Sequence, residues 1–228
     1  MGGVGRRSYP TVKSLIGLYG GSFDPVHNGH VATAAELLAR LPFREIRLLP
    51  AARSPLKGRG LADHHRVAML QLALRPYAGL SVDDRELHRP PPSFTIDTLH
   101  EVRREMGRAT PLAFIMGMDS FLTLPQWKDW QQLTDCAHLI VINRPDHRAV
   151  FTPDLANWLK KHRITDAESL ESRPFGGVLL VETASHDIAS RVIRAAIRSG
   201  QPTSDWLDPT VRDYIDTHRL YAGAAEPQ

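Results

Sequence analysis

The sequence predicts an α/β fold, a Rossmann-like, doubly wound parallel sheet with flanking helices. Short apolar segments alternate with helical patterns about five times along the chain, as repeated βαβ units do. The apolar segments, such as SLIGLY at 14–19, are near-continuous hydrophobic runs, which is typical of strands buried on both faces of a sheet. Because parallel strands connect through right-handed crossovers, these units place helices on both faces of one sheet.

Periodicity and capping signals set the expected boundaries of the elements. We expect strands at 14–19, 44–50, 80–87, 111–119, 137–145 and 177–184. We expect helices at 30–41, 63–77, 93–107, 155–163, 190–199 and 208–218. Asp63 and Ser93 are expected to cap the second and third helices at their N-termini, and Gly107 is expected to end the third.

Length and composition are those of a globular protein with a substantial core. The chain has 228 residues, of which 42% are hydrophobic and 23% are charged. We expect one domain over 13–222, a disordered tail at 1–12 and a polar, variable insertion at 146–176. The single Cys136 allows no internal disulfide, so a reducing, cytoplasmic location is expected.

Charge and hydropathy narrow the expected partners. The net charge of +3 favours anionic ligands such as phosphates, and a solvated basic surface explains it equally well. No stretch approaches the ~18–20 apolar residues of a membrane span, so no membrane partner is expected. Basic residues form no clustered stripe with interleaved aromatics, so no nucleic-acid partner is expected either. The oligomeric state is left open.

The segment GLYGGSFDPVHNGH at 17–30 follows the first predicted strand, at the sheet edge where ligands bind in such folds. Gly20 and Gly21 are expected to let the backbone turn tightly and approach a ligand. His27 and His30 then stand at the entrance of a helix whose N-terminus suits phosphate. Zinc binding and nucleophilic catalysis are disfavoured, because no further ligand or activated nucleophile is apparent. Stabilisation of a transferring phosphoryl group and an ordinary structural turn both remain.

Two motifs resemble the nucleotidyltransferases whose hallmark is H-x-G-H. The first matches [GS]-x-F-D-P-x-H-x-G-H through Gly21, Ser22, Phe23, Asp24, Pro25, His27, Gly29 and His30. The second, at 188–194, resembles the ISSTxIR pattern of nicotinate mononucleotide adenylyltransferases. It keeps Ile188, Ser190, Ile193 and Arg194, while Ala189 and Arg191 depart from the pattern.

Other segments resemble the same family. Residues 50–57 are similar to its P-x-x-x-P-P-H-K loop and keep Lys57, while Ser54 and Leu56 replace the usual proline and histidine. REL at 85–87 followed by SFTIDTL at 93–99, and the G-x-D and tryptophan of 111–127, also match its pattern. The resemblance covers roughly 14–145 and 177–221.

The resemblance implies adenylyl transfer from ATP to nicotinate mononucleotide, giving deamido-NAD and pyrophosphate in NAD biosynthesis. The attacking phosphate has a second pKa of about 6, so it is ionised near neutral pH and needs no catalytic base. This agrees with the lack of a recognisable triad or carboxylate pair in the sequence. The task left to the protein is positioning and charge stabilisation.

The resemblance also implies roles for individual residues. The ATP-binding set is Gly20, Gly21, Ser22, Phe23, His27, His30, Ile188, Ser190 and Arg194. The catalytic set is His27, His30, Lys57 and Arg194, which would stabilise the phosphates. The mononucleotide set is Thr95 for the nicotinate carboxylate, Asp119 for a ribose, Trp127 for the ring and Arg144 for the phosphate. Mg²⁺ is expected to arrive with ATP and to keep water ligands, so no resident metal site is expected.

Two other functions remain as alternatives. Another adenylyl- or cytidylyltransferase with the H-x-G-H core, such as one acting on phosphopantetheine, would use the same phosphate chemistry. A non-catalytic nucleic-acid-binding protein is suggested only by the basic charge balance.

Overall fold

The computed structural model describes residues 13–52, 61–143, 149–184 and 188–222. In this part of the chain, parallel strands form a seven-stranded sheet in the order β3-β2-β1-β4-β5-β7-β6. The chain starts at β1 in the middle of the sheet, builds one half outward and crosses to β4 to build the other. The predicted Rossmann-like, doubly wound sheet is confirmed, with its topological switch between β1 and β4.

The elements fall close to their expected positions. The strands are β1 (Leu15–Gly21), β2 (Phe43–Pro50), β3 (Leu80–Val82), β4 (Leu112–Gly117), β5 (His138–Asn143), β6 (Arg163–Ile164) and β7 (Val178–Glu182). The α-helices are α1 (Asn28–Arg40), α2 (Asp63–Leu74), α3 (Thr95–Met106), α4 (Met118–Leu122), α5 (Leu133–Cys136), α6 (Pro153–His162), α7 (Ser169–Ser172), α8 (Ser190–Arg198) and α9 (Pro209–Thr217). Single 3-10 turns are η1 (Arg85–His88), η2 (Leu124–Gln126) and η3 (Trp130–Gln132).

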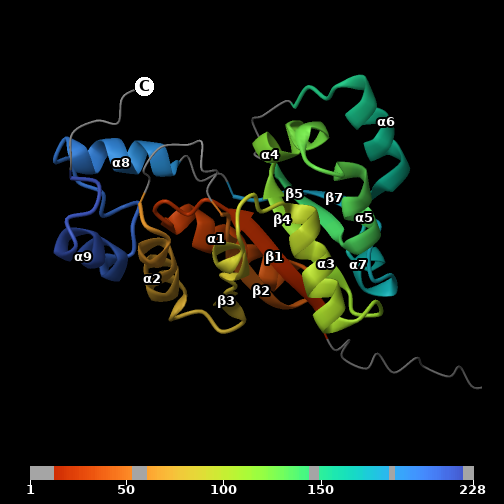
Figure 1. Ribbon diagram of the computed structural model, residues 1–228, viewed down its shortest axis with the longest axis horizontal. Helices are drawn as coiled ribbons and strands as arrows, with labels where there is room; N and C mark the ends of the chain where they lie inside the picture. The colour runs from red at the N-terminus through yellow and green to blue at the C-terminus, as the bar shows by residue number, and fades with distance from the viewer. Residues whose placement is uncertain (1–12, 53–60, 144–148, 185–187, 223–228) are drawn as a thin grey trace, which may run out of the picture.

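The core lies in two layers, one on each face of the sheet. Leu15 and Tyr19 of β1 pack into a cluster with α1, α2, α8 and α9, whereas Ile16 and Leu18 pack into a second cluster with α3 to α6. This alternation follows the two-residue period of a strand. Figure 1 shows α2, α8 and α9 on one side of the sheet and α3 to α6 on the other. No helix in the described ranges is long and apolar enough to cross a membrane.

The predicted strand at 80–87 is shorter than expected. β3 ends at Val82, and the chain then turns into η1. The Asp83 carboxylate accepts hydrogen bonds from the backbone N–H of Arg85 at 3.3 Å and from its Nε at 2.8 Å. Because this side chain bonds the backbone two residues onward, it stabilises a turn in competition with the strand ladder.

Two predicted helix caps are wrong by one position. The N-cap of α2 is Ala62, and Asp63 is its first residue, where it pairs with Arg66 at 2.5 Å. The N-cap of α3 is Phe94, because the Ser93 hydroxyl accepts a hydrogen bond from Arg89 instead. Gly107 does end α3, with φ 79°, a conformation that glycine adopts without a steric penalty.

The described part of the predicted insertion is more ordered in structure than its polar composition suggested. The short helix expected at 155–163 is α6, which buries Leu155, Trp158 and Leu159. β6 then pairs with β7 and extends the sheet by one strand. The boundaries of a single domain over 13–222 stay a prediction, and the tail at 1–12 lies outside the described residues.

His138, at the start of β5, is a fully buried titratable side chain. Its Nδ1 accepts a hydrogen bond from the Gly177 N–H at 3.0 Å, and its Nε2 lies 2.9 Å from the Arg173 carbonyl oxygen. An accepting Nδ1 carries no proton, so the ring is neutral with its hydrogen on Nε2. Burial lowers the pKa of His138 below its usual value of 6.5.

We predict that this histidine makes the fold acid-sensitive. Since its pKa is lower in the folded than in the unfolded chain, the unfolded chain takes up the proton first as the pH falls below about 6.5, and stability declines. His138→Asn, which keeps an acceptor near Gly177, should flatten the slope of unfolding free energy between pH 7 and 5 by up to ~1.4 kcal/mol per pH unit. Urea unfolding at several pH values measures this slope.

The matched control is His100→Asn, on the exposed surface of α3. It should leave the slope unchanged. An unchanged slope in the His138 variant would contradict the prediction.

Candidate active site

A cavity of about 510 Å³ opens at the carboxyl edge of the sheet. This volume lies within the range typical of small-molecule sites. Its walls come from the end of β1, the start of α1, the ends of β4, β5 and β7, and the start of α8. The lining residues are Tyr19, Gly20, Ser22, His27, Gly29, His30, Thr33, Gly117, Met118, Asp119, Ile142, Thr183, Ala184, Ile188, Ala189, Ser190, Arg191 and Arg194.

The turn after β1 takes its left-handed conformation at Phe23, not at a glycine. Gly20 and Gly21 are the last residues of β1, and the positive φ of 46° belongs to Phe23. The Phe23 side chain is fully buried and meets His30 edge-on, with ring centroids 5.0 Å apart. The expectation that the two glycines themselves form the tight turn is therefore wrong.

The glycines are required by aromatic rings that lie against the strand. A Cβ at Gly20 would lie 2.7 Å from Cζ of Phe114, and a Cβ at Gly21 would lie 2.7 Å from Cζ of Phe23. Both rings are buried, so neither can move away cheaply. Gly20 lines the cavity, whereas Gly21 and Phe23 do not; Phe23 packs edge-on against His30, which does line it.

His27 and His30 form a reciprocal cap at the start of α1. The Nδ1 of His27 accepts from the His30 backbone N–H at 3.4 Å, and the Nδ1 of His30 accepts from the His27 backbone N–H at 3.3 Å. The two rings stack with centroids 3.6 Å apart and an interplanar angle of 24°. Each Nδ1 is occupied as an acceptor, so in the neutral rings the hydrogen resides on Nε2.

The electrostatics of the pair favour a neutral His30 ring. Burial lowers the pKa of His30 well below 6.5, and the neighbouring His27 lowers it further. A bound anion therefore meets His30 as an N–H donor without a permanent positive charge. Preorganised donors of this kind can stabilise negative charge that develops on a phosphoryl group.

Side chains of the second motif hold the backbone of the first. Ser190 Oγ donates to the Pro25 carbonyl at 2.9 Å, and Arg194 Nη1 donates to the Asp24 carbonyl at 2.6 Å. Tyr221, near the C-terminus, donates its hydroxyl to the Asp24 carboxylate at 2.7 Å. Ile188, Ser190 and Arg194 also line the cavity, as expected for the ATP-binding set.

A buried arginine of another helix holds the same turn at Ser22. Arg66 of α2 has no exposed surface, and its Nη1 donates to the Ser22 carbonyl at 2.8 Å. Its Nη2 pairs with Asp63 within the helix, as the i, i+3 spacing allows. Sequence reasoning missed the contact to Ser22, because no local pattern encodes it.

The residues expected to bind the mononucleotide are only partly gathered at this cavity. Asp119, in the first turn of α4, lines it, while Thr95 and Trp127 do not. Thr95 is the first residue of α3, a helix end without a side-chain cap. Trp127 is half-buried and lies edge-on to Phe114, with ring centroids 6.4 Å apart. Phe114 thus touches both Trp127 and the strand at Gly20.

Two predicted site residues are not described by the structure, and the described residues hold no metal-binding cluster. Lys57 and Arg144 lie outside the described residues. Within the described ranges, no group of at least three His, Cys, Asp or Glu side chains is arranged to hold a metal ion.

Comparisons with known proteins decide the family. The cytidylyltransferase-like family profile matches residues 18–196. A Serratia proteamaculans protein named "Probable nicotinate-nucleotide adenylyltransferase" is 41% identical over 91% of this chain and 95% of its own length. A Methylococcus capsulatus protein of the same name is 39% identical over 91% of this chain and 100% of its own. The chain belongs to the nicotinate-nucleotide adenylyltransferase family.

The fold of this family is also seen in a solved structure with lower sequence similarity. A Plasmodium falciparum nicotinic acid mononucleotide adenylyltransferase complexed with NaAD superposes with a TM-score of 0.71. Its sequence is 20% identical to this one, and the superposition covers 93% of this chain and the whole of the Plasmodium chain. At this identity the comparison supports the Rossmann-like fold.

Sequence reasoning missed several cavity residues of this family member. Thr183 and Ala184 follow β7, and Ile142 lies at the end of β5. The rule that ligands bind beyond the carboxyl ends of parallel strands could have pointed to all of them, because the strand ends were predicted within a few residues. Thr33, one turn into α1, carried no signal beyond its helical spacing to His30.

We predict that Gly20→Ala is destabilising because of Phe114. The added Cβ would overlap the buried ring, which typically costs ~1–3 kcal/mol. Gly20→Ala combined with Phe114→Leu should recover part of this loss, because the shorter side chain removes the overlapping atom. Denaturant unfolding of the two single variants and the double variant gives the coupling; additive effects would contradict the prediction.

We predict that His30→Ala folds but loses most nucleotidyl transfer. Removing one preorganised donor from the site should lower kcat about 10²–10³-fold. Pyrophosphate release measures kcat, and near-ultraviolet circular dichroism checks the fold. His100→Ala, on the exposed face of α3, is the control and should keep full activity. Near-normal turnover of the His30 variant would remove it from this role.

Proposed function

We propose that the chain transfers the adenylyl group of ATP to nicotinate mononucleotide. A phosphate oxygen of the mononucleotide attacks the α-phosphorus of ATP, and the bond from this phosphorus to the bridging oxygen of the β-phosphate breaks. The products are deamido-NAD and pyrophosphate, a step of NAD biosynthesis. The attacking oxygen is already ionised near neutral pH, because phosphate monoesters have a second pKa of about 6.

The observation that carries the proposal is the pair of stacked histidines in the cavity beyond β1. Their Nδ1 atoms cap the helix, and we assign donation to the ATP phosphates to the Nε2–H groups of His27 and His30. Arg194 lines the same cavity and supplies a permanent positive charge for the triphosphate. We assign a similar role to Lys57 on the strength of the family loop at 50–57.

The mononucleotide would bind toward α3. The uncapped first turn at Thr95 presents backbone N–H groups and the positive end of the helix dipole, which suit the nicotinate carboxylate. The indole of Trp127 would stack on the electron-poor pyridinium, a contact worth about 0.5–2 kcal/mol. Asp119 would bind a ribose and Arg144 the mononucleotide phosphate.

Magnesium belongs to this proposal as part of the substrate, MgATP. Mg²⁺ retains several water ligands and binds substrate phosphates, so it does not require a dedicated set of protein carboxylates. The described residues offer no such set. We also propose a cytoplasmic location, on the basis of the single thiol at Cys136.

A pyrophosphate-release assay tests the proposal. The purified chain would receive ATP and Mg²⁺ with nicotinate mononucleotide, its amide or phosphopantetheine in separate reactions. We expect kcat/KM to be highest for the acid, by at least about tenfold over the amide, which corresponds to ~1.4 kcal/mol. Preference for the amide would overturn the assignment at Thr95, and preference for phosphopantetheine would overturn the pyridine site. Failure to turn over any acceptor would contradict the proposed function.

A further inference from the structure

We propose that Glu86 is a positioning residue that sets the spacing between the two halves of the active site. One half is the phosphate-binding turn after β1, and the other is the first turn of α3, where the mononucleotide is proposed to bind. The inference rests on the proposed function, because its consequence is read in a two-substrate reaction. Glu86 itself is absent from the cavity lining and acts through the residues it holds.

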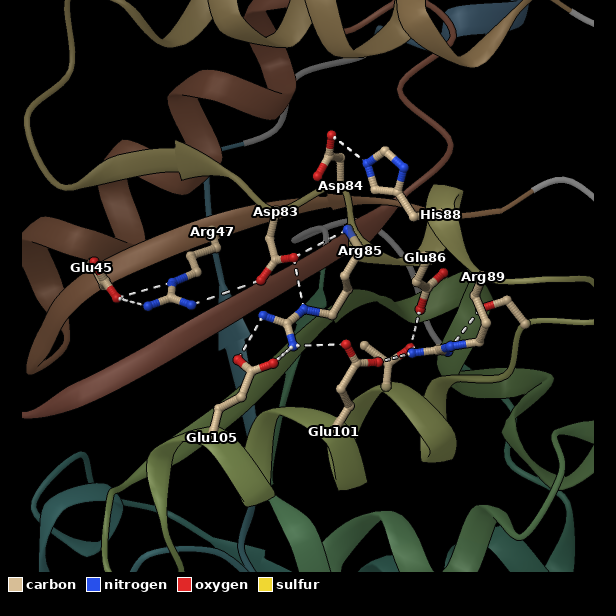
Figure 2. A network of polar contacts seen from close by, with 12 residues as sticks. Glu45, Arg47, Asp83, Asp84, Arg85, Glu86, His88, Arg89, Glu101 and Glu105 are labelled. Carbon is tan, nitrogen blue, oxygen red and sulfur yellow. Dashed lines mark hydrogen bonds and ion pairs between the residues drawn. The ribbon is translucent and has the colours of Figure 1, made fainter.

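Glu86 is a nearly buried carboxylate with two separate hydrogen-bond donors. It lies in η1 and is 6% exposed. Its Oε1 accepts from the Thr98 hydroxyl at 2.7 Å, and its Oε2 accepts from the Ala52 backbone N–H at 3.3 Å. Figure 2 shows the Glu86 side chain extending from η1 toward α3. Each carboxylate oxygen therefore holds a different segment of the chain.

Thr98 connects this carboxylate to the first turn of α3. It is fully buried and lies one turn after Thr95. A hydroxyl has one hydrogen to donate, and the 2.7 Å contact to Glu86 is better than the 3.4 Å approach to the Phe94 carbonyl. The hydroxyl also accepts from Arg89 Nη1 at 3.0 Å, so both of its functions are used.

Ala52 connects the same carboxylate to the phosphate-binding turn. Its neighbour Ala51 donates its backbone N–H to the Gly21 carbonyl at 2.9 Å. Gly21 is the last residue of β1 and directly precedes Ser22 of the cavity. A continuous path thus runs from Gly21 through 51–52 and Glu86 to Thr98.

The chemistry of Glu86 suits this role better than simple packing does. Burial of a carboxylate is unfavourable unless hydrogen bonds compensate for the lost water, and an apolar side chain could fill the same space without that cost. Only an ionised carboxylate offers two acceptor oxygens to two donors. A glutamine would present an NH₂ group to one of them and lose that bond.

The surrounding ion pairs brace the same elements from the solvent side. Arg89 pairs with Glu101, and Arg85 pairs with Asp83 at 2.8 Å and with Glu105 at 2.8 Å, which ties η1 to α3 (Figure 2). Glu105 is about half exposed, at 49%, and its carboxylate accepts hydrogen bonds from Arg85. The outer pairs hold η1 on α3, whereas Glu86 also bonds the backbone at Ala52, just beyond the end of β2.

Displacement of the two halves should affect the reaction more than the binding of either substrate. In-line transfer needs the attacking oxygen and the α-phosphorus at near-contact distance, and a misplacement of ~1 Å can cost about 100-fold in rate. ATP bound alone requires only its own half of the site. Loss of the Glu86 linkage should therefore lower kcat and leave the affinity for ATP nearly unchanged.

Thr98→Val and Thr98→Ser test this without changing a charge. Valine has the shape of threonine but lacks the hydroxyl, and serine restores the hydroxyl. We expect Thr98→Val to lower kcat at least about tenfold. The same variant should keep the dissociation constant of a non-hydrolysable ATP analogue within about twofold of the wild-type value. Thr98→Ser should recover most of the rate. The measurements are made well below the melting temperature of each variant.

Glu86→Gln and Glu105→Gln form a matched pair with the same chemical change. Glu86→Gln should reproduce the loss of kcat, and Glu105→Gln should keep wild-type kcat. A Thr98→Val kcat within about twofold of wild type would overturn the inference. A loss of kcat in Glu105→Gln equal to that in Glu86→Gln would also overturn it, since the effect would then reflect general loosening of α3.

Hydrogen exchange gives a second readout that does not depend on the acceptor. In Thr98→Val, backbone amides of peptides covering 50–52 should exchange faster than in wild type, because Glu86 loses its anchor on α3. Unchanged exchange there would overturn the inference even if the enzyme proved to use another acceptor. A wild-type chain that fails to turn over nicotinate mononucleotide contradicts the proposed function instead, and the exchange result still decides the linkage.

Discussion

The site depends on how the backbone of the turn after β1 is held. Three of its carbonyl groups accept hydrogen bonds from side chains of distant elements. Arg66 donates to Ser22, Arg194 to Asp24 and Ser190 to Pro25. A buried carbonyl without a partner is costly, so these donors both satisfy the turn and fix its position. The contacts explain why two motifs more than 150 residues apart converge on one cavity.

The same turn determines the chemistry of the histidines. His27 and His30 each use Nδ1 to cap α1, so their orientation is set by the helix before any ligand arrives. Burial and mutual proximity lower the pKa of His30 and keep the ring neutral. The two nitrogens of the His30 ring therefore have different functions: Nδ1 caps the helix, and Nε2 is directed at the ligand. Because the ring is already oriented, it does not have to reorient during the reaction. Such preorganisation is a main source of electrostatic catalysis.

Aromatic packing and the Glu86 linkage relate this turn to the rest of the proposed site. Phe114 lies against Gly20 on one side and meets Trp127 edge-on on the other. Glu86 joins the strand end at Ala52 to Thr98 of α3. In a family that acts on two anionic substrates, the distance between half-sites matters as much as the contacts within each. The aromatic contacts join β1, β4 and Trp127, and the polar contacts join the segment after β2 to η1 and α3. Together they set that distance.

The sequence by itself determined the sheet, its order of elements and the family, because hydrophobic periodicity and the two motifs are local signals. The same motifs contain many of the residues that line the cavity. It was wrong where a tertiary contact competed with a local one. Ser93 carried a cap signal, but Arg89 takes its hydroxyl, and Gly20 carried a turn signal, but its lack of a side chain serves Phe114. The contact of Arg66 with Ser22 and the linkage through Glu86 were decided only by the tertiary structure, because they join residues 12 to 44 positions apart that no sequence period relates.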